Sequence, residues 1–254
     1  MKRVAIVMPA HNEEERIGRT LEEYINYFEK VEELDYRIIV VLNACSDRTL
    51  EIVSKFDVDI LNFKQGGKGF AITEGFKEAL KGDFDLIGFV DADMATPPNA
   101  FYDLIKNIDG FGGIMGNRWN KKSKVIKQTF FRQILSRGFN FLVKSLFLFH
   151  YEDTQCGAKL FRRDALKKII PDLYVTHWAY DINLLYSMKK GGYRVVEIPT
   201  EWIDRAGSKL NVKKVPLMMF IGVIRLRIIN SPFKFVSRFY DKLPEWTKIY
   251  RRWW

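Results

Sequence analysis

Short apolar runs alternate with helical stretches through the N-terminal part of the chain, and this alternation constrains the fold more than any other feature. Between the runs, apolar residues recur at intervals of three and four, as in the helix predicted over 17–28. Strand-like runs cover residues 4–8, 37–42, 58–63 and 86–90. Strands and helices at this spacing form βαβ units, so we predict an α/β domain with a mostly parallel sheet flanked by helices.

Two carboxylates, Asp91 and Asp93, follow the apolar run 86–90 directly. Side chains alternate along an extended strand, so positions i and i+2 project to the same side and can share one hard cation. Ligands of open α/β sheets lie beyond the carboxyl ends of the strands. The pair is therefore a candidate metal clamp for a phosphate ester, with an Asp-rich turn that binds nothing as the alternative.

Three other polar loops follow predicted strands, at 9–13, 43–47 and 65–69, and should converge on the same edge of the sheet. Asn, Asp and Glu side chains there can contact a base and a ribose, and Lys68, between two glycines, can approach a phosphate. The lysine loop is not a P-loop, because it lacks the GxxxxGK[ST] spacing and has Gly69 where a metal-binding hydroxyl is needed.

The net charge of +10 lies at the C-terminal end of the chain. Residues 205–254 hold 12 Lys or Arg and two acidic residues, whereas residues 1–204 hold 29 of each sign. Such a block suggests an anionic surface, either lipid head groups or nucleic acid. The apolar run 215–224 is shorter than the roughly 20 residues that span a bilayer. With the aromatic residues after it, this composition indicates an amphipathic interfacial anchor, and a helical bundle packed on the main domain is the alternative.

The stretch 110–151 contains no acidic residue, and its cations alternate with aromatic and aliphatic residues. We predict a basic amphipathic helix within it, either a core helix with solvated cations or a helix near a membrane or a phosphate-rich ligand. Cys45 and Cys156 form no CxxC motif, which favours a reducing compartment. Pro9 ends the first apolar run too early for a signal peptide.

Six short motifs occur together in one order over roughly residues 1–210. They lie at residues 7–14, 43–49, 67–69, 91–93, 155–161, and 197–199 with 205–210. This set resembles family 2 glycosyltransferases of the GT-A (Rossmann-like) fold, in particular the dolichyl-phosphate glucose and mannose synthases. Gln155-Cys156-Gly157 favours the glucose branch. The resemblance implies a GT-A domain over 1–210, and the chain would then end in a basic, aromatic, membrane-associating helical appendage over 211–254.

The resemblance also assigns a nucleotide-sugar site. The matching residues are Pro9, His11, Asn12, Glu13, Asn43, Lys68, Asp91, Ala92, Asp93, Arg205, Ser208 and Lys209. Asp91 and Asp93 match the DxD pair that holds Mg²⁺ or Mn²⁺ on the diphosphate. Asn43 stands where the family commonly has a base-binding aspartate, so the identity of the base stays open. Ala95 stands where mannose synthases can have a glutamine ligand, which would leave the ion with carboxylates, phosphates and water.

A second group of matching residues is implied for the transfer step. These residues are Asp91, Asp93, Arg118, Arg132, Arg137 and Asp181. The arginines would face the acceptor phosphate, while Asp181 matches an acid of the acceptor region whose role is open. A divalent ion, with Arg205 and Lys209, would neutralise the leaving diphosphate. A phosphate monoester is mostly dianionic at neutral pH, so as nucleophile it needs cations rather than a strong general base.

These features predict an inverting hexosyltransferase that uses UDP-glucose or GDP-mannose, with glucose as first choice and mannose as second. The acceptor would be dolichyl or polyprenyl phosphate, and the enzyme would be peripheral on the cytoplasmic face of a membrane. One alternative is a family 2 enzyme with a soluble glycan or protein acceptor. Another is a non-enzymatic basic module that binds membranes or nucleic acid, although no nucleic-acid-binding motif is present and no nucleic acid is expected as a partner.

Overall fold

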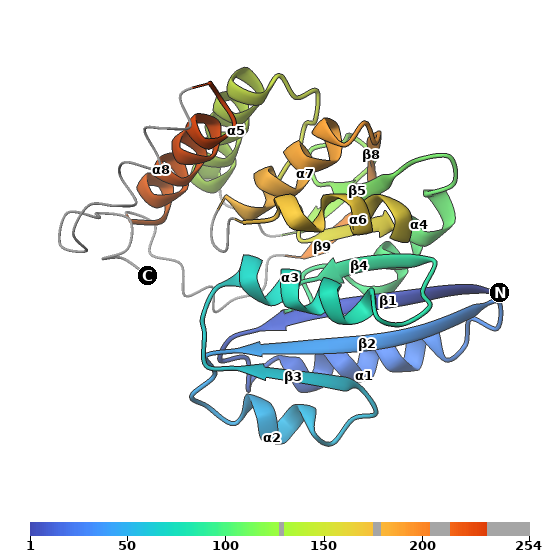
Figure 1. The fold of residues 1–254 in the computed structure, drawn as a ribbon. Helices are drawn as coiled ribbons and strands as arrows, with labels where there is room; N and C mark the ends of the chain where they lie inside the picture. The colour runs from blue at the N-terminus through green and yellow to red at the C-terminus, as the bar shows by residue number, and fades with distance from the viewer. Residues whose placement is uncertain (127–129, 175–178, 204–213, 233–254) are drawn as a thin grey trace.

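The computed structural model describes residues 1–126, 130–174, 179–203 and 214–232. Its main feature is a seven-stranded sheet with the strand order β3-β2-β1-β4-β7-β5-β8 (Figure 1). The strands are β1 Lys2–Ala10, β2 Leu34–Asn43, β3 Asp59–Phe63, β4 Leu86–Val90, β5 Gly113–Asn117, β7 Ala158–Arg162 and β8 Val195–Pro199. All pairs are parallel except the two that β7 makes, so the predicted mostly parallel α/β sheet is confirmed.

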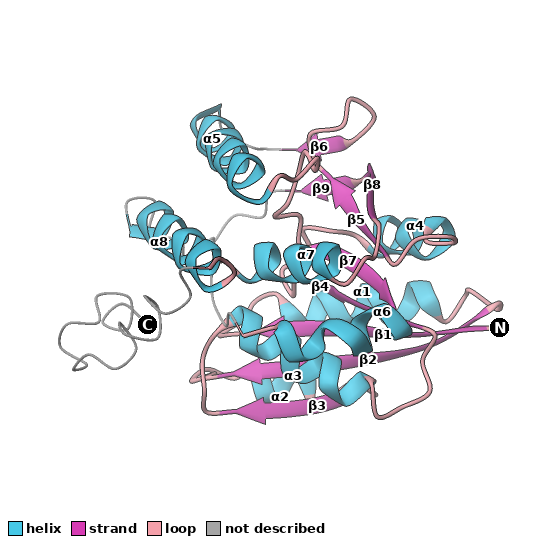
Figure 2. Cartoon of the chain, turned by 45° about the horizontal axis from the view of Figure 1, so that its top comes forward, coloured by secondary structure: helices cyan, strands magenta, loops and turns pink. Residues whose placement is uncertain are grey.

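Helices cover both faces of the sheet and enclose two separate hydrophobic cores (Figures 1 and 2). One core lies under α1 Ile17–Phe28, α2 Thr49–Val53 and α4 Pro98–Asn107. The other lies under α3 Lys68–Ala79, α6 Arg163–Ile169 and α7 Tyr180–Lys190; the short 3-10 turn Ile170–Asp172 follows α6. Alternate residues of β1 enter alternate cores, because successive side chains of a strand point to opposite faces.

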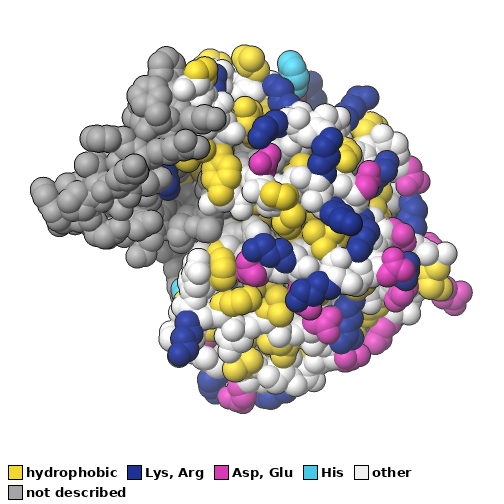
Figure 3. Space-filling view, in the orientation of Figure 1, with side chains coloured by type: hydrophobic (Ala, Val, Ile, Leu, Met, Phe, Trp, Pro, Cys, Tyr) yellow, Lys and Arg dark blue, Asp and Glu magenta, His cyan; other side chains and the backbone are white. Residues whose placement is uncertain are grey.

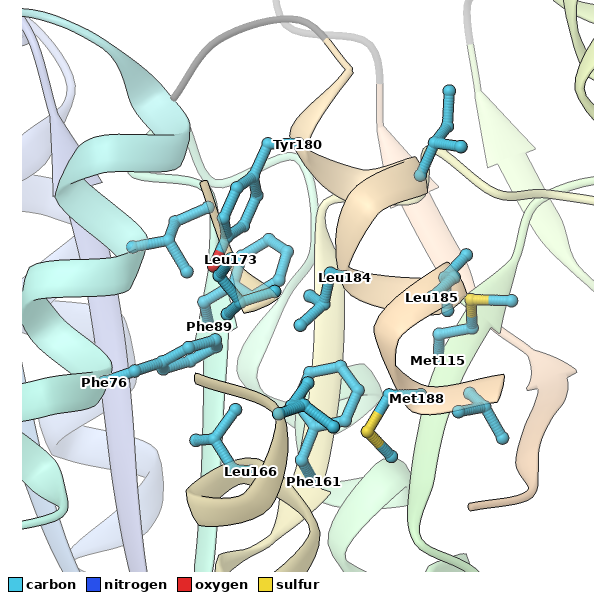
Figure 4. Close-up of a cluster of buried hydrophobic side chains, with 14 of the residues drawn as sticks. Phe76, Phe89, Met115, Phe161, Leu166, Leu173, Tyr180, Leu184, Leu185 and Met188 are labelled. Atoms are coloured by element: carbon cyan, nitrogen blue, oxygen red, sulfur yellow. The ribbon is translucent and has the colours of Figure 1, made fainter. Parts of the chain in front are cut away.

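The second core fixes the two central strands against α3 and α7 (Figure 4). The ring of Phe76, on α3, lies 6.1 Å from that of Phe89, on β4, and 6.2 Å from that of Phe161, on β7, measured between centroids. All three side chains are fully buried. Burying an aromatic side chain of this size contributes roughly 2–3 kcal/mol, so β4 and β7 are rigidly placed beneath the loops that follow them.

Strand β7 runs antiparallel between β4 and β5. The sequence motif over residues 155–161 does not indicate the direction of this strand. In the observed register Phe89 pairs with Lys159 and Val90 pairs with Ala158. The segment that precedes β7, residues 153–157, therefore reaches the same edge of the sheet as the segment that follows β4.

A smaller layer stands beside the main sheet. Strands β6 Lys124–Ile126 and β9 Glu201–Ile203 form a two-stranded parallel sheet, and helices α5 Phe130–Phe147 and α8 Lys214–Ile229 lie side by side (Figures 1 and 2). The predicted basic helix thus begins only at Phe130. Val223 and Leu226 of α8 are buried in the core under α3 and α7, so this part of α8 packs on the main domain.

The surface of the main domain carries both signs of charge, and acidic and basic side chains lie interspersed on the face drawn in Figure 3. Phe141 and Leu148, on and just after α5, are 73% and 72% exposed, and Phe220 of α8 is 44% exposed. Among the described residues, every helix falls short of the length and apolar character needed to cross a membrane.

Candidate active site

The predicted metal-binding pair lies on a turn at the edge of the main sheet. Strand β4 ends at Val90, and residues 92–96 form turns and bends in which Met94 has a φ of 60°. Asp93 Oδ1 accepts a hydrogen bond from the backbone N–H of Ala95 at 3.0 Å. We expected Asp91 and Asp93 to project to the same side because side chains alternate along an extended strand. That reason is wrong, because the two residues follow the strand and the turn sets the directions of their side chains.

Asp91 is held between a cation and a glycine. Lys68 Nζ forms an ion pair with Asp91 Oδ1. A Cβ added at Gly157 would clash with Asp91 Oδ2, so a larger residue there would displace the Asp91 carboxylate. Partial burial raises the pKa of the Asp91 carboxyl, and Lys68 acts against this rise while Asp93 adds to it. The charge of Asp93 thus adds to the effect of burial on Asp91, and a cation bound by both carboxylates would offset both effects.

Lys159 is a fully buried cation beneath this pair. Its Nζ donates to Asp181 Oδ1 at 2.6 Å and to the Cys156 carbonyl at 2.7 Å, and it lies 5.4 Å from the centroid of the Phe89 ring. Lys159 therefore links the turn before β7 to the first turn of α7, where Asp181 is 15% exposed. We did not assign a role to Lys159 from the sequence; the available signal was a lysine within an apolar strand.

The turn after β1 is tied to the turn after β2 by Asn43. The Asn43 side chain is 3% exposed, donates to the Ala10 carbonyl at 2.8 Å and accepts from the Gly67 N–H at 3.1 Å. The backbone carbonyl of Asn43 accepts a hydrogen bond from His11 Nδ1 at 2.7 Å. The predicted base-contacting residue thus holds three loops together.

The remaining predicted nucleotide contacts lie at the end of β1, in the turn that follows β1 and, for Ala92, in the turn after β4. Asn12 has a φ of 53°, and its Oδ1 accepts from the Ser46 N–H at 2.8 Å. Pro9 is buried within β1, and Ala92 is 3% exposed. Glu13 forms a salt bridge with Arg16 at 2.6 Å. Partial burial raises the pKa of Glu13 against the effect of Arg16, and the charges of Asp93 and Asp91 raise it further.

Two of the predicted acceptor arginines have different surroundings. Arg118 Nε and Nη2 donate to the two oxygens of Asp153 at 2.7 and 2.8 Å, and the Arg118 guanidinium lies 5.2 Å from the Trp202 ring. Asp153 is 2% exposed; burial raises its pKa, but Arg118 outweighs burial and holds it below the ordinary value. Arg137 is exposed and lies 5.1 Å from the ring of Trp119.

The other predicted site residues cannot be placed in this geometry. Arg205, Ser208 and Lys209 lie outside the described residues. Arg132 belongs to α5, but its side chain is outside the described part of the structure.

The carboxylate pair fits an ion that takes most of its ligands from substrate and water. Within the described residues, no group of three or more His, Cys, Asp or Glu side chains is arranged to hold a metal. Mg²⁺ commonly uses one or two carboxylates together with substrate phosphates and water, and Mn²⁺ accepts the same oxygen ligands. Asp91 and Asp93 match this requirement, since Asp91 remains 32% exposed beside Lys68.

Comparison with known proteins finds one matching family model and several similar proteins. The model of the family described as "Glycosyl transferase family 2" matches residues 5–170. A dolichyl-phosphate beta-glucosyltransferase of Dictyostelium discoideum is 30% identical over 243 residues, which are 88% of this chain and 73% of that protein. The human protein of the same name is 32% identical over 262 residues, with 92% of this chain and 78% of that protein covered.

Solved structures share the fold at lower sequence identity. Glucosyl-3-phosphoglycerate synthase from Mycobacterium tuberculosis, crystallised with Mn²⁺, UDP and phosphoglyceric acid, superposes with a TM-score of 0.64 and 16% identity. The match covers 89% of this chain and 78% of that one. A structure of the same synthase with Mg²⁺ and UDP gives a TM-score of 0.65 at the same identity and coverage. These neighbours confirm the GT-A type of architecture.

Proposed function

The chain belongs to glycosyl transferase family 2, and on that premise we propose that it transfers glucose from UDP-glucose to dolichyl phosphate or a related polyprenyl phosphate. Transfer would invert the anomeric centre. The observation that carries this proposal is the Asp91–Asp93 pair on the turn after β4, in contact with Lys68 and closed on one side by Gly157. The two dolichyl-phosphate glucosyltransferases named above support the choice of sugar and acceptor.

The donor half of the site would hold the nucleotide diphosphate. Asp91 and Asp93 would bind Mg²⁺ or Mn²⁺, which supplies charge neutralisation for the departing UDP. Lys68 is near enough to Asp91 to reach a phosphate beside it. The loops tied together by Asn43 would form the wall against which the nucleoside lies. Arg205, Ser208 and Lys209 are proposed to close over the diphosphate.

The acceptor half would hold a phosphate monoester, which is mostly dianionic at neutral pH. Arg137 is exposed at the edge beyond β5, and we propose that it and Arg132 bind this phosphate. Arg118 is already paired with Asp153, so we propose that it acts by shaping the loop after β5. No strong general base is then required, and Asp181, paired with Lys159, is proposed to order the acceptor region.

We further propose that the protein is peripheral on the cytoplasmic face of a membrane. The exposed side chains of Phe141 and Leu148 and the basic, aromatic composition of residues 211–254 support this arrangement. The proposed GT-A domain would comprise residues 1–210 and the proposed appendage residues 211–254.

Transfer of radiolabelled glucose tests the proposal. Purified protein should move the label from UDP-glucose into a butanol-extractable lipid only when dolichyl or polyprenyl phosphate and Mg²⁺ or Mn²⁺ are present. Asp91→Asn and Asp93→Asn should each reduce this transfer at least about a hundredfold, because each removes a charge that a metal ion needs. GDP-mannose serves as the competing donor. Full activity in EDTA, or transfer only to soluble glycans or proteins, would refute the proposal.

A further inference from the structure

The ion pair between Lys68 and Asp91 places a cation on a predicted metal ligand. Lys68 Nζ contacts Asp91 Oδ1, and the two side chains are 44% and 32% exposed. The ammonium group also lies 5.9 Å from the centroid of the Phe89 ring, at the end of β4. The pair is therefore accessible to a ligand arriving from solvent, unlike the pair between Lys159 and Asp181 beneath it.

An ammonium group and a divalent ion compete for the same carboxylate. Lys68 contacts Oδ1 of Asp91, and a Cβ added at Gly157 would clash with Oδ2. An ion that binds Asp91 while Lys68 remains there would be repelled by a like charge at short range. Binding of the ion therefore requires the Lys68 side chain to move.

The surrounding backbone allows Lys68 to move its side chain without moving its helix. Lys68 is the first residue of α3, and it follows Gly67, which has a φ of 124°. Gly69 packs so closely on the ring of Tyr180 that an added Cβ would lie 2.6 Å from it. The helix start is thus fixed against α7, while the exposed lysine chain can rotate.

We propose that Lys68 couples metal binding to diphosphate binding. Paired with Asp91, it disfavours a divalent ion that arrives alone; when a diphosphate arrives as well, the ammonium group transfers to a phosphate oxygen and releases the carboxylate to the ion. The same residue thus opposes one ligand and attracts the other. The inference rests on the proposed function, because it requires a nucleotide diphosphate as the donor.

Binding measurements on Lys68→Met test this inference without any turnover. Mn²⁺ binding is followed by electron paramagnetic resonance of the free ion, and UDP binding by calorimetry, each ligand alone and in the presence of the other. We expect Lys68→Met to bind Mn²⁺ alone at least about fivefold more tightly and UDP alone at least about fivefold more weakly than the unaltered protein. Lys77→Met is the matched control, because Lys77 also lies on α3 and forms an ion pair with Glu74 rather than with a residue of the candidate site. The affinities of this variant for Mn²⁺ and UDP should be unchanged.

The opposite signs of the two shifts distinguish coupling from a structural role. If Lys68 only supports the loop, its replacement weakens the binding of both Mn²⁺ and UDP, and this result would overturn the inference. Unchanged Mn²⁺ affinity would overturn it too. Lys68→Arg keeps the positive charge, so its affinities for Mn²⁺ and UDP should match those of the unaltered protein. If the unaltered protein binds neither UDP nor GDP in the presence of Mn²⁺, the proposed function itself fails, which is a separate outcome from binding without opposite shifts.

Discussion

The two halves of the sheet on either side of β4 are built in different ways. On one side β1, β2 and β3 are parallel, and β1 and β2 share an unbroken register from Lys2↔Leu34 to Ala10↔Leu42. On the other side β7, β5 and β8 stand out of sequence order, and β7 is antiparallel. The first half is proposed for the donor and the second for the acceptor.

The polar groups buried in the two halves differ as well. The donor half is tied by neutral groups, since Asn43 and Thr20 make hydrogen bonds to backbone carbonyls. The acceptor half buries charges, with Lys159 paired to Asp181 and Asp153 paired to Arg118. A buried charge that loses its partner is far more costly than a lost neutral hydrogen bond. The acceptor half should therefore be the more sensitive to single substitutions.

The largest effect is expected from Lys159→Met, which removes the cation that joins β7 to α7. Asp181 would lose its partner and Cys156 the donor to its carbonyl. Breaking a buried pair costs about 3–5 kcal/mol, so the free energy of unfolding in urea should fall by about that amount. Lys167→Met is the control, because Lys167 is exposed on neighbouring α6 and should change stability by less than about 0.5 kcal/mol.

A double variant separates charge from packing at this position. Lys159→Met combined with Asp181→Asn leaves no unpaired charge, so it should regain about half or more of the lost stability. If the double variant is less stable than Lys159→Met alone, the pair does not act through its charge, and the contrast between the two halves loses its main support.

The same contrast explains what the sequence could and could not predict. Strands β1 to β4 and helix α1 follow from local apolar spacing, because each strand contains a short apolar run and the helix carries its apolar residues at intervals of three and four. The direction of β7 and the pairing of Lys159 with Asp181 depend on residues far apart in the chain, for which a single sequence has no local signal. The sequence predicts the carboxylate pair because Asp91 and Asp93 are only two residues apart, but it does not predict the turn that orients their side chains.

Arg118→Gln should have the next largest effect, and its size should depend on pH. Without the Arg118 guanidinium, Asp153 keeps the hydrogen bonds from the backbone N–H groups of residues 118 and 155 but loses the cation paired with it, so stability at pH 7 should fall by about 3 kcal/mol. In the unaltered protein the Asp153 pKa lies below the ordinary value, despite burial, because of Arg118. The stability gained from this pair is therefore complete above the unfolded pKa of about 3.9 and is lost as the pH falls through the folded value.

In the variant we expect the pKa of Asp153 to shift upward instead, because burial is the largest influence on this carboxyl and the Arg118 guanidinium no longer acts against it. The variant should lose the most stability at neutral pH and recover part of it as the carboxyl becomes protonated. The free energies of unfolding of the variant and of the unaltered protein, measured in urea, should differ less at pH 4 than at pH 7. A difference that stays constant or widens would contradict this account. Arg48→Gln removes an exposed pair with Glu14 and should change little at any pH.

A smaller loss is expected in the donor half, from Asn43→Ala. The Ala10 carbonyl and the Gly67 N–H would lose hydrogen bonds in a buried position, at a cost of about 1–2 kcal/mol. The KM for UDP-glucose should rise together with this loss, because the loops would no longer be held in one arrangement. If KM rises while stability is unchanged, Asn43 contacts the base directly, as its sequence position suggests. Asn62→Ala, at an exposed position on β3, is the control.

Trp119→Ala should have the smallest effect, because the Arg137 guanidinium that stacks on Trp119 is exposed and the substitution leaves no buried charge without a partner. Stacking uses the face of the guanidinium and leaves its N–H edge for a phosphate. Such a contact is worth about 0.5–1 kcal/mol at an exposed site, so the KM for the lipid phosphate should rise about two- to fivefold. Neither the KM for UDP-glucose nor the urea midpoint should move, and Trp119→Phe should retain most of the effect of the ring. A loss of stability comparable to that of Arg118→Gln would mean that Trp119 belongs to the buried framework, and the two arginines would then not differ as the structure indicates.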